Sequence, residues 1–314
     1  MLFSSTAVGT SAIYAKEMAS VPNNKAAVST LHIYNWADYI GDNVLQEFKD
    51  YVKKTDGVDL DVVYETFDTN EIMLSQLETG SASYDLICPS DYMIQRMMAK
   101  GLLIPFATGE DRATLYGERS EGWDDNYSSY ASHYLQSVFK AITSPIADTG
   151  TIGTLGEYAR CYMWGTLGIL YNPGFSTYTK RGLSLDQVKY DMNDWNSLWK
   201  DEYKGTFQIK DSMRDTYSVA LMKTYDSLFK SLKEEHDKGT LTDEEYNKKV
   251  TIIFNNISHV SEFNALSGEK EVTADGIIDR IQEDLVSLRE NSYGLEVDSG
   301  KTDITDGKMS GIGM

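Results

Sequence analysis

The sequence predicts an α/β fold in which a mostly parallel sheet is covered by helices. Three observations support this prediction. In the first hundred residues, short runs of branched and aromatic residues alternate with segments whose apolar residues recur at helical spacing. The connections are short, as in the crossover units that join parallel strands. The chain is 41% hydrophobic, so it has enough apolar residues to bury a sizeable core.

Strands and helices alternate in the N-terminal part. Strands are predicted at residues 31–34, 60–64 and 85–89, each rich in branched or aromatic side chains. A helix is predicted after each strand. Asp42 is the expected cap of the first helix, and the other two cover residues 70–78 and 92–100, the last ending at Gly101. The resulting order is β-α-β-α-β-α.

The remaining chain divides into a weakly patterned stretch and a second α/β region. We predict a leader remnant and linker at 1–29, a first lobe at 30–110, a long surface excursion at 111–158 and a second lobe at 159–314. Within the second lobe, a short helix is expected at 194–203, a strand at 205–210 and a helix at 213–230. Thr242 and Glu245 form a capping-box helix start, and a further helix carries Ile277, Ile281 and Leu288.

Both ends of the chain are predicted to be cut. Residues 1–15 are apolar with no charge before Lys16, as in the tail of a signal peptide or membrane helix; a disordered N-terminus is the alternative. Residues 303–308 are turn-like, and residues 309–314 read as the opening of a strand that stops. We therefore expect a C-terminal truncation.

Charge and motifs exclude several classes of function. The chain has 48 acidic and 29 basic residues, a net charge of -19. A nucleic-acid-binding protein needs a basic surface, so this class is excluded. An acidic surface instead attracts small cations. The four histidines and two cysteines show no metal spacing, and no cofactor or nucleophile motif is present. The Asp- and Gly-rich residues 298–307 do not follow the EF-hand order. Composition does not exclude a glycosidase, but no acid/base pair of carboxylates stands out. We expect no metal and no cofactor.

Candidate ligand-binding residues follow the first and third strands. In parallel sheets, ligands bind at the carboxyl ends of strands. Trp36, Asp38 and Tyr39 follow the first strand, whereas Ser90 and Tyr92 follow the third, so all five are expected at one edge. Two simpler interpretations stay open, because aromatic residues more often pack in the core, and a carboxylate such as Asp38 can cap the helix region at Asp42.

The second lobe offers a weaker candidate. Ser212 and Asp215 have the S-x-x-D spacing of a capping box, which explains both residues without a ligand. Cys88 is expected to pack in the core beside the third strand, and Cys161 has no identifiable role.

The sequence resembles the spermidine/putrescine-binding proteins, the extracytoplasmic receptors of polyamine ABC transporters. The resemblance covers most of residues 30–314, and the combination of its motifs is specific. Four blocks carry it: Ile33-Tyr34-Asn35-Trp36-Ala37-Asp38-Tyr39-Ile40, Tyr84-Asp85-Leu86-Ile87-Cys88-Pro89-Ser90-Asp91-Tyr92-Met93, Trp164-Gly165-Thr166-Leu167-Gly168-Ile169, and Trp195-Asn196-Ser197-Leu198-Trp199 through Asp211-Ser212-Met213-Arg214-Asp215.

The resemblance implies a two-lobed, periplasmic-binding-protein-like fold of type II whose lobes close around the ligand. It implies ligand contacts from residues of all four blocks: Trp36, Asp38, Tyr39, Ser90, Tyr92, Trp164, Thr166, Asp211, Ser212 and Asp215. Asp215 falls where the family places an amine-binding acid. Ser212 stands where members often carry another acid, which leaves the number of ammonium sites open.

The resemblance also implies a place and partners. The chain is expected outside the bacterial cytoplasmic membrane, on its periplasmic or extracellular face, as a non-enzymatic monomer that delivers polyamine to ABC permease subunits. A membrane would be contacted only through an N-terminal anchor or fusion. Family members continue past Met314, so the second lobe and the return crossing are expected to be incomplete. The rivals are the same fold with another small cation or solute, and a secreted hydrolase.

Overall fold

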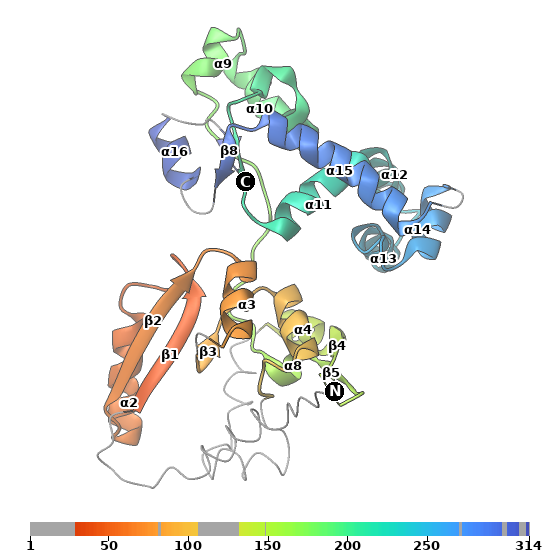
Figure 1. Ribbon diagram of the computed structural model, residues 1–314. Coiled ribbons are helices and arrows are strands. Elements are labelled where there is room, and N and C mark those ends of the chain that lie inside the picture. The colour runs from red at the N-terminus through yellow and green to blue at the C-terminus, as the bar shows by residue number, and fades with distance from the viewer. Residues whose placement is uncertain are drawn as a thin grey trace, which may run out of the picture. The chain divides into compact units, whose positions relative to one another are not determined.

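The computed structural model describes residues 29–80, 83–105, 132–147, 149–269, 272–296, 300–307 and 312–313. The chain divides into two compact units, Met1–Gly165 and Thr166–Met314, the first and second unit below (Figure 1). The leader remnant and linker predicted at 1–29 lie outside the described residues except for Ser29. Within the described parts of the chain, no helix has both the length and the apolar content that a membrane crossing requires.

The first unit is built on a three-stranded parallel sheet with strand order β2-β1-β3. β1 (Ser29–Trp36) pairs along its whole length with β2 (Leu60–Phe67), from Ser29 opposite Leu60 to Trp36 opposite Phe67. β3 (Leu86–Ile87) pairs with the other side of β1. The helices α2 (Val44–Asp56), α3 (Asn70–Glu78) and α4 (Asp91–Ala99) follow the three strands in turn. The predicted β-α-β-α-β-α order is confirmed.

Local signals determine where these helices begin and end. Thr69 caps α3, since its side chain accepts a hydrogen bond from the Ile72 N–H at 3.2 Å. The prediction for Asp42 is wrong, because α2 begins after Asn43, whose side chain makes no capping hydrogen bond. α2 ends at Gly57 in the left-handed conformation (φ 68°), which a glycine adopts without steric cost.

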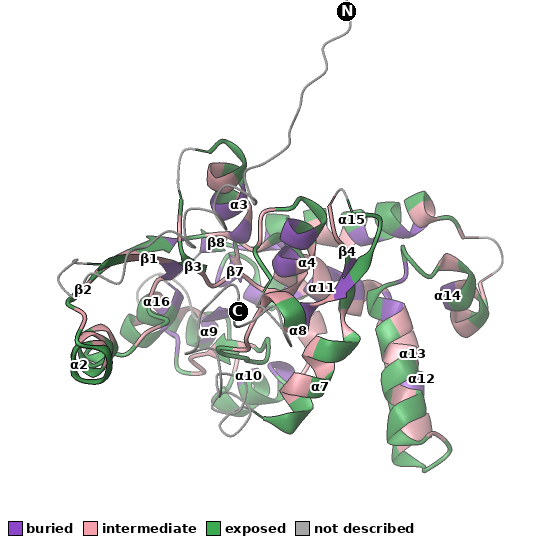
Figure 2. Ribbon diagram, turned by 90° about the horizontal axis from the view of Figure 1, so that it is seen from below, coloured by how far each residue is buried: buried purple, intermediate pink, exposed green. Residues whose placement is uncertain are grey.

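The core of the first unit lies between the sheet and the helices α3 and α4. It consists of Tyr34, Phe67, Met73, Leu74, Met93 and Met97, all buried. Figure 2 shows buried residues along α4, whereas α2 buries none of its side chains completely. Flexible methionine side chains fill the irregular space beneath the aromatic rings. This packing holds the carboxyl ends of the strands in place.

Residues 132–158 differ from the predicted surface excursion. They form α7 (His133–Ala141), an antiparallel pair of strands β4 (Thr143–Pro145) and β5 (Ile152–Thr154), and the short helix α8 (Leu155–Tyr158). Leu155 is fully buried and packs with residues of α4. Apolar patterning is weak here because each element is short and fully buries at most one residue. Residues 106–131 lie outside the described part.

The second unit is also α/β, with many more helices than strands. β7 (Gln208–Lys210) pairs in parallel with β8 (Gly294–Glu296), and β6 (Leu170–Tyr171) pairs antiparallel with β9 (Ile312–Gly313). The strand predicted near the end of the chain is therefore present. The helices are α9 (Ser176–Lys180), α10 (Leu185–Asp191), α11 (Met213–Thr224), α12 (Asp226–Asp237), α13 (Asp243–Phe254), α14 (Val260–Ser267), α15 (Ala274–Asn291) and α16 (Gly300–Asp306).

Three predicted elements of this unit need correction. Residues 194–203 form two 3₁₀ helices, η2 (Trp195–Trp199) and η3 (Asp201–Tyr203), in place of one α-helix. The helix predicted at 213–230 is interrupted at Tyr225, where α11 ends and α12 begins. Residues 303–308, predicted as a turn, belong largely to α16. By contrast, the predicted capping box at Thr242 and Glu245 is confirmed, with both of its hydrogen bonds formed.

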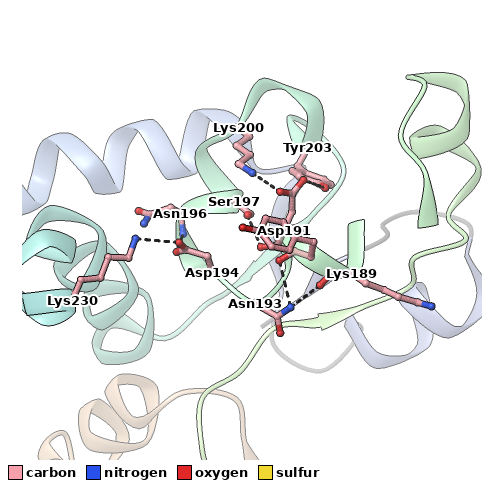
Figure 3. Close-up of polar contacts among 10 residues, drawn as sticks. Lys189, Asp191, Asn193, Asp194, Asn196, Ser197, Lys200, Tyr203 and Lys230 are labelled. Atoms are coloured by element: carbon pink, nitrogen blue, oxygen red, sulfur yellow. Dashed lines mark hydrogen bonds and ion pairs between the residues drawn. The ribbon is translucent and has the colours of Figure 1, made fainter. Parts of the chain in front are cut away.

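A buried carboxylate organises the turn between α10 and η3 (Figure 3). Asp191 is 5% exposed; its two carboxylate oxygens accept hydrogen bonds from Lys200 at 2.5 Å and from the Tyr203 hydroxyl at 2.7 Å. Ser197 donates to the Asp191 carbonyl oxygen at 2.6 Å. Burial by itself raises the pKa of Asp191, but hydrogen bonds from Lys200, Tyr203 and Gln187 outweigh it and lower that pKa below its ordinary value.

Candidate functional site

The first-unit rim is the edge formed by the carboxyl ends of β1, β2 and β3, namely residues 36–39, 67–71 and 88–92. Because the three strands are parallel and in one sheet, their carboxyl ends meet at the same edge. This edge is where ligands of parallel α/β sheets bind. The five residues predicted to lie together, Trp36, Asp38, Tyr39, Ser90 and Tyr92, all belong to it.

Trp36 combines the two interpretations that the sequence left open. It is the last residue of β1 and lies half-buried, with its ring 4.5 Å from that of Phe67, which is directly opposite it in the sheet. Its ring is also 6.4 Å from that of Tyr39, which is 42% exposed. Trp36 is thus anchored in the core on one side while its neighbour Tyr39 offers an accessible aromatic face.

Asp38 has an unusual backbone conformation. It is exposed, and its φ of 57° makes it the only non-glycine residue with positive φ among the described residues. Asp and Asn adopt this left-handed conformation at lower cost than other residues. Since Asn43 occupies the cap position of α2, Asp38 is not that helix's cap. The tight turn at Asp38 follows β1 directly and places a carboxylate on the rim.

The segment after β1 is tied to the end of the first unit. The Tyr162 hydroxyl donates to the backbone carbonyl oxygen of Tyr39 at 2.5 Å, although the two residues are far apart in sequence.

Cys88 lies half-buried just after β3, and its N–H donates to the Tyr34 carbonyl oxygen at 3.0 Å. Burial raises the pKa of the Cys88 thiol to about 11, with the nearby Cys161 adding to the effect. This thiol is therefore protonated at neutral pH and resembles a core residue more than a nucleophile.

Ser90 and Tyr92 are held by two residues that the sequence analysis missed. The Asn70 amide nitrogen donates to the Ser90 hydroxyl and to the Tyr92 hydroxyl, both at 3.0 Å. The Tyr92 hydroxyl donates to a Glu71 carboxylate oxygen at 3.0 Å. Asn70 and Glu71 begin α3, directly after β2. The strand-end rule applied to the second strand, as it was to the first and third, would have found them.

Trp164 and Thr166 lie on an irregular segment rather than on the rim. Trp164, near the end of the first unit, is 74% exposed, and Thr166, the first residue of the second unit, is also exposed. Neither takes part in the rim hydrogen bonds described above. Their proposed role in ligand binding stays a prediction.

The second unit has its own strand-end cluster. Asp211 and Ser212 follow β7, and Glu296 ends the parallel strand β8. The Asp211 N–H donates to the Glu296 carbonyl oxygen at 2.8 Å, which joins the two strand ends. The Glu296 carboxylate, 7% exposed, accepts a hydrogen bond from the Gly300 N–H at 3.0 Å. Glu296 was not predicted, since it ends a strand of only three residues.

Of the predicted capping pair, the Ser212 side chain caps a helix and the Asp215 side chain does not. The Ser212 hydroxyl accepts a hydrogen bond from the Asp215 N–H at 3.4 Å and caps α11. The half-buried Asp215 carboxylate has no hydrogen bond or ion pair with any other described residue. Capping therefore explains the serine, whereas the carboxylate is left available to a ligand.

No group of acidic, histidine or cysteine side chains suited to a metal ion is found in the part of the chain that the structure describes. The rim instead combines aromatic faces, hydroxyl groups and carboxylates. Such a set can bind a small organic cation, because aromatic faces attract cations and cover apolar groups, while oxygen atoms accept hydrogen bonds from them.

Known proteins with similar sequences are binding proteins for polyamines. The chain is 28% identical over 196 residues to the spermidine/putrescine-binding periplasmic protein of Escherichia coli (strain K12), covering 62% of this chain and 44% of that protein. It is 31% identical over 156 residues to the putrescine-binding periplasmic protein SpuD of Pseudomonas aeruginosa, covering 50% of this chain and 33% of that protein. The chain thus spans less than half the length of these relatives. No protein-family model matches it.

A solved structure supports the fold. The chain is similar to a structure described as a spermidine/putrescine ABC transporter from Listeria monocytogenes, with a TM-score of 0.52 and 21% sequence identity. The similarity covers 91% of this chain and 62% of that one. The predicted α/β fold of the periplasmic-binding-protein type is confirmed.

Proposed function

We propose that this chain binds a polyamine, spermidine or putrescine, outside the cytoplasmic membrane and delivers it to the permease subunits of an ABC importer without altering it. The names of the relatives support this function, since they describe polyamine-binding periplasmic proteins. The observation that carries it is the first-unit rim, where Trp36, Tyr39, Ser90 and Tyr92 meet at the carboxyl ends of parallel strands.

The chemistry of the rim suits a polyamine, which is a flexible chain of methylene groups with ammonium groups at its ends. The aromatic face of Tyr39 and the accessible part of Trp36 cover methylene groups and attract ammonium, each cation–π contact contributing about 0.5–2 kcal/mol. Asp38 supplies a charge-assisted hydrogen bond, which is roughly twice as strong as a neutral one.

In the second unit, Asp215 is the proposed ammonium-binding carboxylate. Its carboxylate has no partner among the described residues, and it lies in the first turn of α11, shortly after β7. The neighbouring Asp211 is exposed on the same turn, whereas Ser212 serves as the cap of α11. With Ser212 engaged in this way, Asp211 is the candidate for a second carboxylate in this unit. How many ammonium groups bind here determines the preferred ligand length.

The test is calorimetric titration of the chain with putrescine and with spermidine. We expect saturable binding of at least one amine, weakened about tenfold or more by Trp36→Ala and by Asp38→Ala. Tyr190→Ala is the matched control, because Tyr190 is an exposed aromatic residue of α10 outside both strand-end clusters. The recovered amine should be chemically unchanged.

Three outcomes would overturn the proposal or its placement at the rim. A folded chain that binds neither amine would mean that the cargo is another small cation or solute. Conversion of the amine into a product would favour an enzyme. Equal losses from Tyr190→Ala and Trp36→Ala would show that the amine binds to the acidic surface rather than to the rim.

A further inference from the structure

We propose that Asn70 and Glu71 are positioning residues that present Ser90 and Tyr92 to an ammonium group as hydrogen-bond acceptors. The inference rests on the proposed function, because it specifies how an amine would be recognised at the rim. It starts from the first turn of α3. Thr69 caps this helix, so α3 begins at Asn70 and Glu71, shortly after the carboxyl end of β2.

The orientation of the Asn70 amide follows from one backbone contact. The Ser90 N–H lies 3.1 Å from the Asn70 oxygen Oδ1. A backbone N–H can only donate, so the amide oxygen must face it and the amide nitrogen must face the other way. Asn70 is 4% exposed, and burial prevents the amide from reorienting toward water.

In this orientation, the Asn70 amide nitrogen donates a hydrogen bond to each of two hydroxyl groups. It lies 3.0 Å from both the Ser90 and the Tyr92 hydroxyl oxygen. An amide NH₂ group has two protons to donate and no acceptor capacity, so both oxygens accept from it. Ser90 also occupies the position before α4 where a serine usually caps a helix, yet its side chain makes no capping hydrogen bond. Its hydroxyl is directed to Asn70 instead.

The Tyr92 hydroxyl has one proton, and it donates that proton in a hydrogen bond to the Glu71 carboxylate. The Tyr92 oxygen lies 3.0 Å from Glu71 Oε1, and an ionised carboxylate accepts but does not donate. Any other group that approaches this oxygen must therefore be a donor. Donation to a carboxylate also increases the negative charge on the phenolic oxygen, which strengthens its interaction with a donor.

The consequence is a preference for cationic donors. An ammonium group carries three N–H donors and no acceptor, so it matches the Tyr92 oxygen, whose proton is already directed to Glu71, and the Ser90 oxygen can accept from it as well. A carboxylate or phosphate ligand would meet the Tyr92 oxygen as acceptor against acceptor, which is unfavourable. Asn70 and Glu71 thus select the class of ligand without touching it.

The experiment is a double-mutant cycle read by titration with putrescine and spermidine. Its variants are Glu71→Gln, Tyr92→Phe and the combination. We expect Glu71→Gln to weaken binding about tenfold in the unmodified chain, as for loss of a hydrogen bond to a charged group, and to have little effect when Tyr92→Phe has already removed the hydroxyl. In a Ser90→Ala background the Glu71→Gln loss should persist, since Ser90 does not contact Glu71 directly.

Glu78→Gln is the matched control. Glu78 lies at the other end of α3 and pairs with Lys100 at 2.5 Å, so the change removes the same charge from the same helix away from the rim. We expect it to leave the affinity unchanged. Thermal unfolding without ligand checks that every variant folds. As a readout that needs no ligand, the NMR signals of the Asn70 side-chain amide should shift in Glu71→Gln and Tyr92→Phe but not in Glu78→Gln.

The outcomes separate this inference from the proposed function. If the unmodified chain binds neither amine, the proposed function fails and the inference fails with it. If the unmodified chain binds but Glu71→Gln costs the same with and without the Tyr92 hydroxyl, Glu71 acts on the ligand by its own charge and the positioning role is overturned. No change in affinity in Glu71→Gln would also overturn it.

Discussion

At the scale of single residues, two buried polar side chains, Asn70 in the first unit and Asp191 in the second, are satisfied by partners from other elements. Asn70 bridges α3 and the start of α4, and Asp191 bridges α10 and the 3₁₀ turns that follow. A buried polar group without such partners would destabilise the fold, so these contacts constrain backbone position as well as side-chain orientation. The rim and the Asp191 network are therefore rigid for the same physical reason.

The Asp191 network makes stability depend on pH in a defined direction. The folded pKa of Asp191 lies below its ordinary value of 3.8, because hydrogen bonds from Lys200 and Tyr203 outweigh the effect of burial. The stabilisation is thus fully present above that value and is lost as the pH falls through the lower folded pKa. We expect Asp191→Asn to reduce the free energy of unfolding at pH 7 by about 1–2 kcal/mol, since the hydrogen bonds from Lys200 and Tyr203 would then reach a neutral amide in place of a carboxylate.

Denaturant unfolding at pH 7 and at pH 3 measures this effect. The loss in Asp191→Asn should be larger at pH 7 than at pH 3, because protonation weakens the same contacts in the unmodified chain. Asp186→Asn, at an exposed position on α10, is the control and should change little. Equal losses at both pH values would show that the charge of Asp191 does not matter.

At the scale of elements, boundaries follow capping residues more closely than apolar periodicity. The periodicity of residues 213–230 continues through Tyr225, yet α11 ends there with a non-helical backbone (φ -109°, ψ 24°), and the Tyr225 ring packs edge-on against Phe263 of α14 at 4.9 Å. By contrast, the capping box at Thr242 and Glu245 is local, and it starts α13 where the sequence predicts. The hydrogen bonds of the capping box are encoded by neighbours in sequence, whereas the apolar periodicity does not reveal the break at Tyr225.

The capping box of α13 can be tested by Thr242→Ala. The Thr242 hydroxyl accepts from the Glu245 N–H at 3.2 Å, so its removal leaves a helix donor without its partner. We expect a loss of about 1 kcal/mol in the free energy of unfolding. Thr251→Ala on the same helix is the control, because the Thr251 hydroxyl only donates to the Asn247 carbonyl. Similar losses in both variants would argue against a specific capping contribution.

At the scale of the whole molecule, the net charge of -19 is the dominant feature. A field of this sign concentrates small cations near the surface and raises the rate at which they associate. Because surface charges are screened within about 8 Å at physiological ionic strength, the effect depends on salt.

We therefore expect the association rate of putrescine with the chain to fall severalfold between low and physiological salt. The dissociation rate should change less, because contacts at the rim are short-range. Stopped-flow fluorescence, with Trp36 and other tryptophans as reporters, measures both rates. An association rate independent of salt would show that the acidic surface does not steer the ligand.

Much of the site could be predicted from the sequence because strand ends in a parallel sheet share an edge. Trp36, Asp38, Tyr39, Ser90 and Tyr92 were placed at the rim by that rule, and the structure places them there. Asn70 and Glu71 were missed because the rule was not applied to the second strand, after which a polar pair at a helix start has an ordinary local explanation. Only their contacts with Ser90 and Tyr92 show another role.

The sequence by itself determined the alternation of strands and helices in the first unit, the helix start at Thr242 and the acidic character of the surface, since each depends on neighbouring residues or on composition. Only the tertiary structure decided that Leu155 packs against α4, that Ser212 caps a helix while the Asp215 carboxylate takes no part in the capping, and that the Tyr92 proton points to Glu71. These depend on atoms brought together by folding from distant parts of the chain or by side-chain orientation, and no local pattern encodes them.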